Sequence, residues 1–209
     1  MESEISQNES LVTSQNFFPK YSILFQIVLG LVFAGLNFLV SLIQSFEIIP
    51  LFLDTIFTAT ASFFGLLCGF ISATVYHSLC IIIWKEELIK FIWALCSYSL
   101  VLIIRLYIRK KTKLSLVDII NLIFLNAVII SIEGAFIFLI LHTVIKYNED
   151  SSVRTMYLIL IKNNISIFIS SLLSRIPVNI LDKGISVVGG YYSYLGIRKL
   201  YNKLQKSVS

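Results

Sequence analysis

The sequence predicts an all-α, polytopic membrane protein with about six transmembrane helices in one bundle. The chain of 209 residues is 57% hydrophobic and only 14% charged, and its mean hydropathy is +0.86. A soluble domain has charged side chains at about a quarter of its positions. The apolar residues also form continuous runs, rather than the segments of about ten alternating residues that are typical of membrane β-barrels.

The chain divides into one membrane domain with a polar segment at each end. Residues 1–20 are polar and acidic, whereas a signal peptide has a basic start and an early apolar core. We therefore expect a disordered cytoplasmic tail over 1–20, a single transmembrane helical domain over 21–201, and a basic cytoplasmic tail over 202–209.

The apolar runs and their breaks set the expected helices. The block before Lys85 is too long for one span, and Gly65 and Gly69 interrupt it near the middle, so it divides into two short helices. Pro177 is expected to break the last apolar stretch. The expected helices cover residues 22–45, 51–64, 66–84, 88–108, 116–145, 152–174 and 178–200.

The basic residues indicate the orientation of these helices. They cluster in two places: Arg105, Arg109, Lys110, Lys111 and Lys113, and then Arg198, Lys199, Lys203 and Lys206. Short basic segments beside membrane spans face the cytoplasm. Both clusters and the N-terminus lie inside only if residues 152–200 cross the bilayer once. We therefore expect an outer-leaflet or re-entrant helix over 152–174, with a full seventh span as the alternative.

Two lone carboxylates follow Ile-Pro pairs at the starts of expected helices. Asp54 comes after Pro50, and Asp182 comes after Pro177. A carboxylate at a helix start is stabilised by the helix dipole, which is a purely structural role, and Asp182 has Lys183 beside it as a partner. An ionisable residue inside a membrane protein also indicates a functional site. The functional hypothesis is that both carboxylates face one outward cavity.

The block from Pro50 to Gly69 resembles a known family. Its residues Pro50, Asp54, Thr55, Thr58, Gly65 and Gly69 are similar to a pattern in the second and third helices of substrate-binding S components of energy-coupling factor (ECF) transporters, with Gly65 one position early. Asp182-Lys183 before Ile-Ser resembles the last helix of that family.

The resemblance implies a six-helix subunit of a bacterial plasma membrane that binds a vitamin or related micronutrient from outside. Such a subunit has no cofactor or ATPase of its own, and it docks on a membrane coupling subunit that carries two cytoplasmic ATPases. The resemblance also implies a docking motif of small residues in the first helix, where this chain has Gly30 and Ala34. Small residues four apart allow close helix approach in lipid, and an internal packing seam is the alternative.

Four more residues are candidates for the substrate site. Glu133 lies in the middle of the 116–145 helix, where insertion of a carboxylate costs roughly 2.5–3.5 kcal/mol. Asn126 and His142 are expected near the same face of the helix, so the three would form a polar wall; a pair between Glu133 and Arg175 is the alternative. Arg175 and Asn179 flank Pro177 and are candidate donors to an anionic or amide-bearing ligand.

No motif in the sequence indicates an enzyme. There is no phosphate-binding GxxxxGK[ST], HExxH or GxSxG pattern, and the three cysteines lie in apolar segments without metal-ligand spacing. The resemblance implies that the partners are a small molecule, the lipid bilayer and the transporter subunits, and nucleic acid is not expected. A membrane sensor or interaction module with the same bundle is the alternative function.

Overall fold

The computed structural model describes residues 21–44, 51–111, 113–148 and 151–208, and within these ranges the chain is helical and has no strand. The helices are α2 (Ile23–Gln44), α3 (Ile56–Phe64), α4 (Leu66–Trp84), the 3-10 helix η1 (Leu88–Trp93), α5 (Ala94–Ile108), α6 (Leu116–Ile145), α7 (Ser151–Lys162) and α8 (Ile167–Val208). The all-helical fold class is therefore confirmed. The predicted tail over 1–20 and Pro50 lie outside the described residues.

Several predicted helices agree closely with the structure. The ranges 66–84 and 116–145 match α4 and α6, and α2 lies within the predicted 22–45. The predicted 88–108 helix is η1 followed directly by α5. The N-terminus of α6 has a capping box. In it, Ser115 Oγ accepts from the Asp118 N–H at 3.2 Å, and Asp118 Oδ2 accepts from the Ser115 N–H at 3.0 Å.

The prediction of a break at Pro177 is wrong. The chain turns instead at Asn163–Asn164, where Asn164 has a φ of 61°, and α8 then runs without interruption through Pro177. Proline is tolerated in a membrane helix where hydroxyl side chains and neighbouring helices satisfy the local backbone. In the turn before Pro177, Ser174 Oγ donates to the Ser171 carbonyl at 2.9 Å. The predicted 152–174 and 178–200 helices are thus replaced by α7 and one long α8, which also continues into the predicted 202–209 tail.

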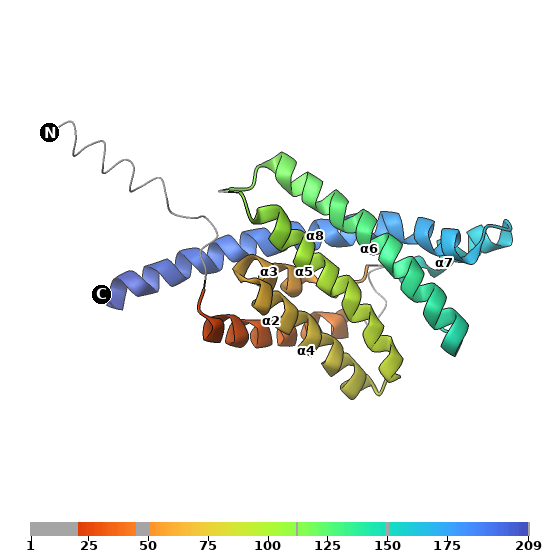
Figure 1. The fold of residues 1–209 in the computed structure, drawn as a ribbon, viewed down its shortest axis with the longest axis horizontal. Helices are drawn as coiled ribbons and strands as arrows, with labels where there is room; N and C mark the ends of the chain where they lie inside the picture. Colours follow the sequence, from red (N-terminus) through yellow and green to blue (C-terminus); the bar gives the residue numbers. More distant parts are fainter. Residues whose placement is uncertain (1–20, 45–50, 112, 149–150, 209) are drawn as a thin grey trace.

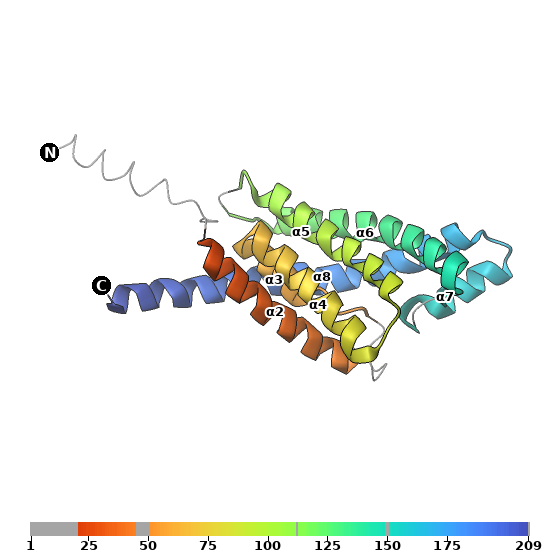
Figure 2. The same cartoon turned by 60° about the horizontal axis from the view of Figure 1, so that its bottom comes forward.

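The long helix α8 organises the bundle (Figures 1 and 2). It packs against α6, α3 and α7, while α2, α3 and α4 pack against one another. The start of α2 lies beside the last turns of α8, because the rings of Tyr21 and Phe25 lie 6.1 and 5.5 Å from that of Tyr201.

The connection from α5 to α6 lies at this same end of the molecule (Figure 1). We call it the basic end; its basic residues are Arg109, Lys110, Lys111, Lys113, Arg198, Lys199 and Lys203.

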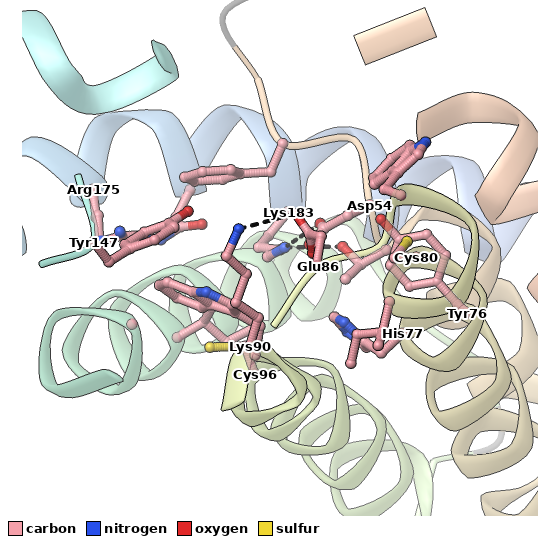
Figure 3. Close-up of a pocket in the computed structure, with 18 residues that line it drawn as sticks. Asp54, Tyr76, His77, Cys80, Glu86, Lys90, Cys96, Tyr147, Arg175 and Lys183 are labelled. Carbon is pink, nitrogen blue, oxygen red and sulfur yellow. Dashed lines mark hydrogen bonds and ion pairs between the residues drawn. The ribbon is translucent and has the colours of Figure 1, made fainter. Parts of the chain in front are cut away.

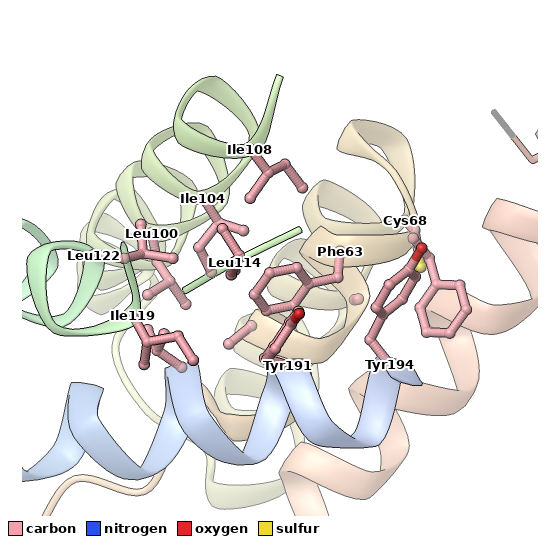
Figure 4. Close-up of a cluster of buried hydrophobic side chains, with 14 of the residues drawn as sticks. Phe63, Cys68, Leu100, Ile104, Ile108, Leu114, Ile119, Leu122, Tyr191 and Tyr194 are labelled. Carbon is pink, nitrogen blue, oxygen red and sulfur yellow. The ribbon is translucent and has the colours of Figure 1, made fainter. Parts of the chain in front are cut away.

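The main hydrophobic core fills the space between α3, α5, α6 and α8 (Figure 4). Phe63, Leu100, Ile104 and Tyr194 are fully buried there. The helices approach closely where α8 crosses α3: a Cβ on Gly190 would lie 3.0 Å from the Thr60 backbone nitrogen. Glycine at position 190 therefore allows contact between the two backbones.

The short helix α3 is held at both ends by side chains from other helices. At its start, Asn37 of α2 accepts from the Phe57 N–H at 2.8 Å and donates to Thr58 Oγ1 at 2.7 Å. At its end, the Arg105 guanidinium of α5 donates to the carbonyls of Ser62 and Phe63 at 3.4 and 3.3 Å. These bonds satisfy terminal backbone groups that the helix itself leaves unpaired.

The outer surface of the bundle is apolar. Leu24 on α2 is 72% exposed and Phe124 on α6 is 62% exposed, and many other large apolar side chains are exposed on these helices. Among the described residues, four helical segments are long and apolar enough to cross a membrane: Ile23–Leu42, Leu66–Trp84, Leu88–Ile108 and Leu116–Ile145. An apolar surface of this extent is compatible with a membrane-embedded protein.

Candidate functional site

A cavity of about 160 Å³ opens at the end of the bundle opposite the basic end. It lies where the segment before α3, the end of α4, η1, α6 and α8 meet (Figure 3). Its aromatic lining residues are Phe52, Tyr76, Trp84, Trp93 and Tyr147. Its charged lining residues are Asp54, Glu86, Lys90, Arg175 and Lys183. Such a concentration of charge in an apolar bundle marks this cavity as the candidate site.

Lys183 lines the cavity and is the centre of a buried polar network. Its Nζ donates to Asp182 Oδ2 at 2.6 Å and to Thr55 Oγ1 at 2.9 Å, and Thr55 Oγ1 shares a hydrogen bond with Ser186 Oγ at 3.2 Å. Asp182, Thr55 and Ser186 are almost completely buried. A buried ion pair is tolerated only when further hydrogen bonds satisfy its remaining polar atoms, and this network supplies them.

The same network fixes the chain entry into α3. The predicted 51–64 helix begins only at Ile56, and the preceding residues are non-helical, with Leu53 at a φ of 48°. The Leu53 N–H donates to Asp182 Oδ1 at 2.7 Å. Asp182 therefore binds the α3 entry segment as well as Lys183, and it sits inside α8 rather than at a helix start.

Asp54 faces the cavity from this entry segment. Its side chain is 30% exposed, and its Oδ1 lies 3.7 Å from Lys183 Nζ, which is too far for a hydrogen bond. That oxygen is shielded from solvent and accepts no hydrogen bond from any described residue. Of the two carboxylates that the sequence predicts at the mouth, Asp54 lines the cavity and Asp182 does not.

Three more charged side chains line the cavity: Glu86, Lys90 and Arg175. Lys90 Nζ is 3.2 Å from Glu86 Oε1 and 5.3 Å from the centre of the Tyr147 ring. The Arg175 guanidinium lies 4.9 Å from the centre of the Trp93 ring. In Figure 3, Arg175 and Tyr147 are at one end of the cavity, and Asp54, Tyr76 and Cys80 are at the other.

Neutral polar side chains complete the lining. Asn179 Nδ2 donates to Ser131 Oγ at 2.9 Å, which links α8 to α6, and His77 Nε2 shares a hydrogen bond with Ser97 Oγ at 2.9 Å. Arg175 and Asn179, which the sequence predicts as donors to an anionic or amide-bearing ligand, both line the cavity.

The three polar residues predicted as a wall on α6 do not line the cavity. Asn126 is buried and donates to the Leu122 carbonyl of its own helix at 2.7 Å. Glu133 lies beside Ser99 of α5. His142 shares a hydrogen bond with the Tyr147 carbonyl at 2.9 Å. Nine residues make about two and a half turns of helix, so His142 lies on the side of α6 opposite Glu133.

The small residues predicted for partner docking pack inside the chain. A Cβ on Gly30 would lie 2.9 Å from the Cys68 carbonyl of α4, and Ala34 is fully buried beside Tyr76 and Cys80. In this structure α4 occupies the Gly30–Ala34 surface, as in the internal packing alternative.

The sequence interpretation missed most of the residues that line this site, among them Thr55, Glu86, Lys90 and Trp93. Thr55 follows Asp54 directly and is one of the residues in which the Pro50–Gly69 block resembles the S-component pattern. Glu86, Lys90 and Trp93 belong to or flank η1, and the sequence gives no signal that this segment folds over the cavity.

Comparison of the chain with models of protein families, with curated proteins and with solved structures finds no match. The geometry of the cavity is therefore the basis for inferring a function.

Proposed function

We propose that the chain is a membrane-embedded, non-enzymatic subunit that binds a small polar solute, as the S components of ECF-type importers do. The observation that carries the proposal is a charged, aromatic cavity in an otherwise apolar helical bundle, at the end opposite the basic end. Such cavities are the default hypothesis for small-molecule sites.

The charge distribution supports an outward-facing site. Basic segments beside membrane helices face the cytoplasm, so the basic end is the cytoplasmic end in this proposal and the cavity opens on the outside. The membrane is a bacterial plasma membrane. The six passes are α2, the short α3, α4, η1 with α5, α6 and α8, while α7 stays at the outer side.

The bound solute is a vitamin or related micronutrient in this proposal. A coupling subunit with two cytoplasmic ATPases delivers it, so ATP is used by the partners. The cavity volume of about 160 Å³ suits a small compound. For comparison, an apolar cavity of about 150 Å³ in another protein holds one benzene molecule.

Three experiments test the proposal. Native mass spectrometry of the detergent-purified chain, without added ligand, is expected to find a stoichiometric small molecule that is released on denaturation. Affinity purification from the source membrane is expected to recover a coupling subunit and ATPases. Uptake of the released compound by cells that express the complex completes the test. Ligand binding without these partners and without uptake would favour the sensor function instead.

A further inference from the structure

We infer that the cavity takes a small organic cation, about one ring in size, with its positive charge against Asp54. The inference rests on the proposed binding function and names the ligand class of the same cavity. Four observations lead to it: the charge around Lys183, an oxygen of Asp54 without a hydrogen bond, the aromatic lining, and the positions of the other cavity cations.

The charges around Lys183 do not balance. One ammonium lies between two carboxylates, at 2.6 Å from Asp182 and 3.7 Å from Asp54. Lys183 gives its short contacts to Asp182 and Thr55, and its side chain is only 3% exposed. The local sum with all three groups ionised is one negative charge, and Asp54 is the member that faces the cavity.

The shielded Oδ1 of Asp54 lacks a hydrogen-bond donor among the described residues. A buried acceptor without a donor is costly, and a bond from a charged donor to a carboxylate is stronger than a neutral one. Oδ1 is closed to solvent and lies on the Lys183 side, so a ligand reaches Asp54 through the exposed remainder of its carboxylate. A bound cation there would supply the missing positive charge.

The walls near Asp54 suit a cation with a flat ring. Tyr76 lies beside Asp54 in Figure 3, and Trp84 also lines the cavity. A cation is attracted to the faces of aromatic rings, most strongly to tryptophan. The same rings offer apolar area to the uncharged part of the ligand.

The other cations of the cavity do not neutralise Asp54. Lys90 is paired with Glu86 at 3.2 Å. Arg175 is held between the rings of Trp93 and Phe52, at 4.9 and 5.7 Å from their centres, at the end away from Asp54. The end of the cavity at Asp54 therefore stays negatively charged, although the cavity lining as a whole contains both positive and negative side chains.

The test compares three probes of one ring size on the purified full chain: benzylammonium, benzyl alcohol and benzoate. We expect benzylammonium to raise the thermal unfolding midpoint at a concentration about tenfold or more below that needed for benzyl alcohol, and benzoate to have no effect. Equal responses to the three probes, a response to benzoate alone, or no response to benzylammonium would overturn the inference.

A cysteine readout locates the bound probe. Cys80 lines the cavity at the Asp54 end, whereas Cys68 is in the hydrophobic core. Modification by methyl methanethiosulfonate, followed by peptide mass spectrometry, should become slower at Cys80 with benzylammonium and stay unchanged at Cys68. Binding by benzylammonium that leaves the modification of Cys80 unchanged would contradict a site at Asp54.

A matched pair of variants tests the carboxylate itself. Asp54→Asn should weaken benzylammonium binding about tenfold or more and leave benzyl alcohol binding unchanged. Glu87→Gln removes an exposed carboxylate near the same end, outside the cavity, and should bind like the wild type. Wild-type affinity in Asp54→Asn overturns the inference. If Asp54→Asn does not fold, the three-probe comparison on the wild type still decides.

The outcomes separate this inference from the proposed function. An anionic ligand bound in a complex with a coupling subunit and ATPases would overturn the inference of a cationic ligand and support the proposed importer function. If the chain binds a cation but affinity purification recovers no such partners, the cationic ligand class is supported and the importer function is rejected.

Discussion

Asp54 and Asp182 occupy similar places in the sequence and very different places in the structure. Each follows an Ile-Pro pair by a few residues, and each lies near Lys183. Asp182 has no exposed surface, and its two oxygens bind the Leu53 N–H and Lys183 Nζ. Asp54 is partly exposed to the cavity and has one shielded oxygen without a hydrogen bond from the described residues.

The difference separates a structural carboxylate from a ligand-facing one. Asp182 holds the α3 entry segment against α8, and this contact fixes where Asp54 stands. A buried charge that is fully hydrogen-bonded serves the fold, whereas a carboxylate that is partly exposed to a cavity is available to a ligand. Substitutions at and around the pair should separate the two roles.

Asp182→Ala should have the largest effect. It removes the partner of buried Lys183 and the acceptor of the Leu53 N–H, so we expect a loss of about 3–5 kcal/mol in the free energy of unfolding. Denaturant or thermal unfolding in detergent measures this loss. The double variant Asp182→Asn with Lys183→Met should recover part of it, because no uncompensated charge is then buried. If Asp182→Ala is as stable as the wild type, Asp182 does not have the structural role described.

Thr55→Val should have a smaller effect of the same kind. The hydroxyl accepts from Lys183 Nζ and shares a hydrogen bond with Ser186, and valine keeps the shape but leaves both groups without that partner. We expect a loss of about 1–3 kcal/mol in the free energy of unfolding. Thr55→Ser, which retains the hydroxyl, is the control. Equal losses in both variants would show that packing, not hydrogen bonding, matters at this position.

Asp54→Asn should change stability least among the residues of the network. Its shielded oxygen accepts no hydrogen bond from the described residues. We therefore expect a change within about 1 kcal/mol in the free energy of unfolding. The same unfolding assay, run beside Asp182→Ala, measures the comparison directly. A loss as large as that of Asp182→Ala would make the two carboxylates equivalent.

Glu133→Gln should have the smallest effect on ligand binding. Glu133 is outside the cavity lining, beside Ser99 of α5. Benzylammonium affinity should therefore stay within about twofold of the wild type. Titration of the unfolding midpoint with the probe checks this. A large loss would restore Glu133 to the substrate site that the sequence predicts.

The parts of the fold that depend on local composition were predictable. The boundaries of α4 and α6 follow from apolar runs that end at charged residues or Gly65. The continuity of α8 was not predictable in this way. Whether a proline ends a helix depends on which neighbours satisfy the local backbone, and α6 and α7 pack against α8 only in the folded chain.

The candidate site was predictable only in part, for the same reason. Asp54, Arg175 and Asn179 reach the cavity as predicted, because each lies close to the segment that enters α3 or to the facing part of α8. Lys90 and Trp93 come from a 3-10 helix whose placement depends on its packing against α4 and α6. His142 does not share a face with Glu133, because nine residues make about two and a half turns of helix and place the two side chains on opposite sides of α6.

The length of the uninterrupted α8 can be compared with the thickness of a bilayer. The helix has 42 residues. At about 1.5 Å per residue it measures about 63 Å, which is roughly twice the ~30 Å hydrocarbon thickness of a bilayer. In the proposed topology α8 crosses the bilayer once, so about half of its length lies in the headgroup regions or in water. The surplus length at the start of α8 packs against α7. The surplus at its end carries basic residues and projects beyond the bundle (Figure 1).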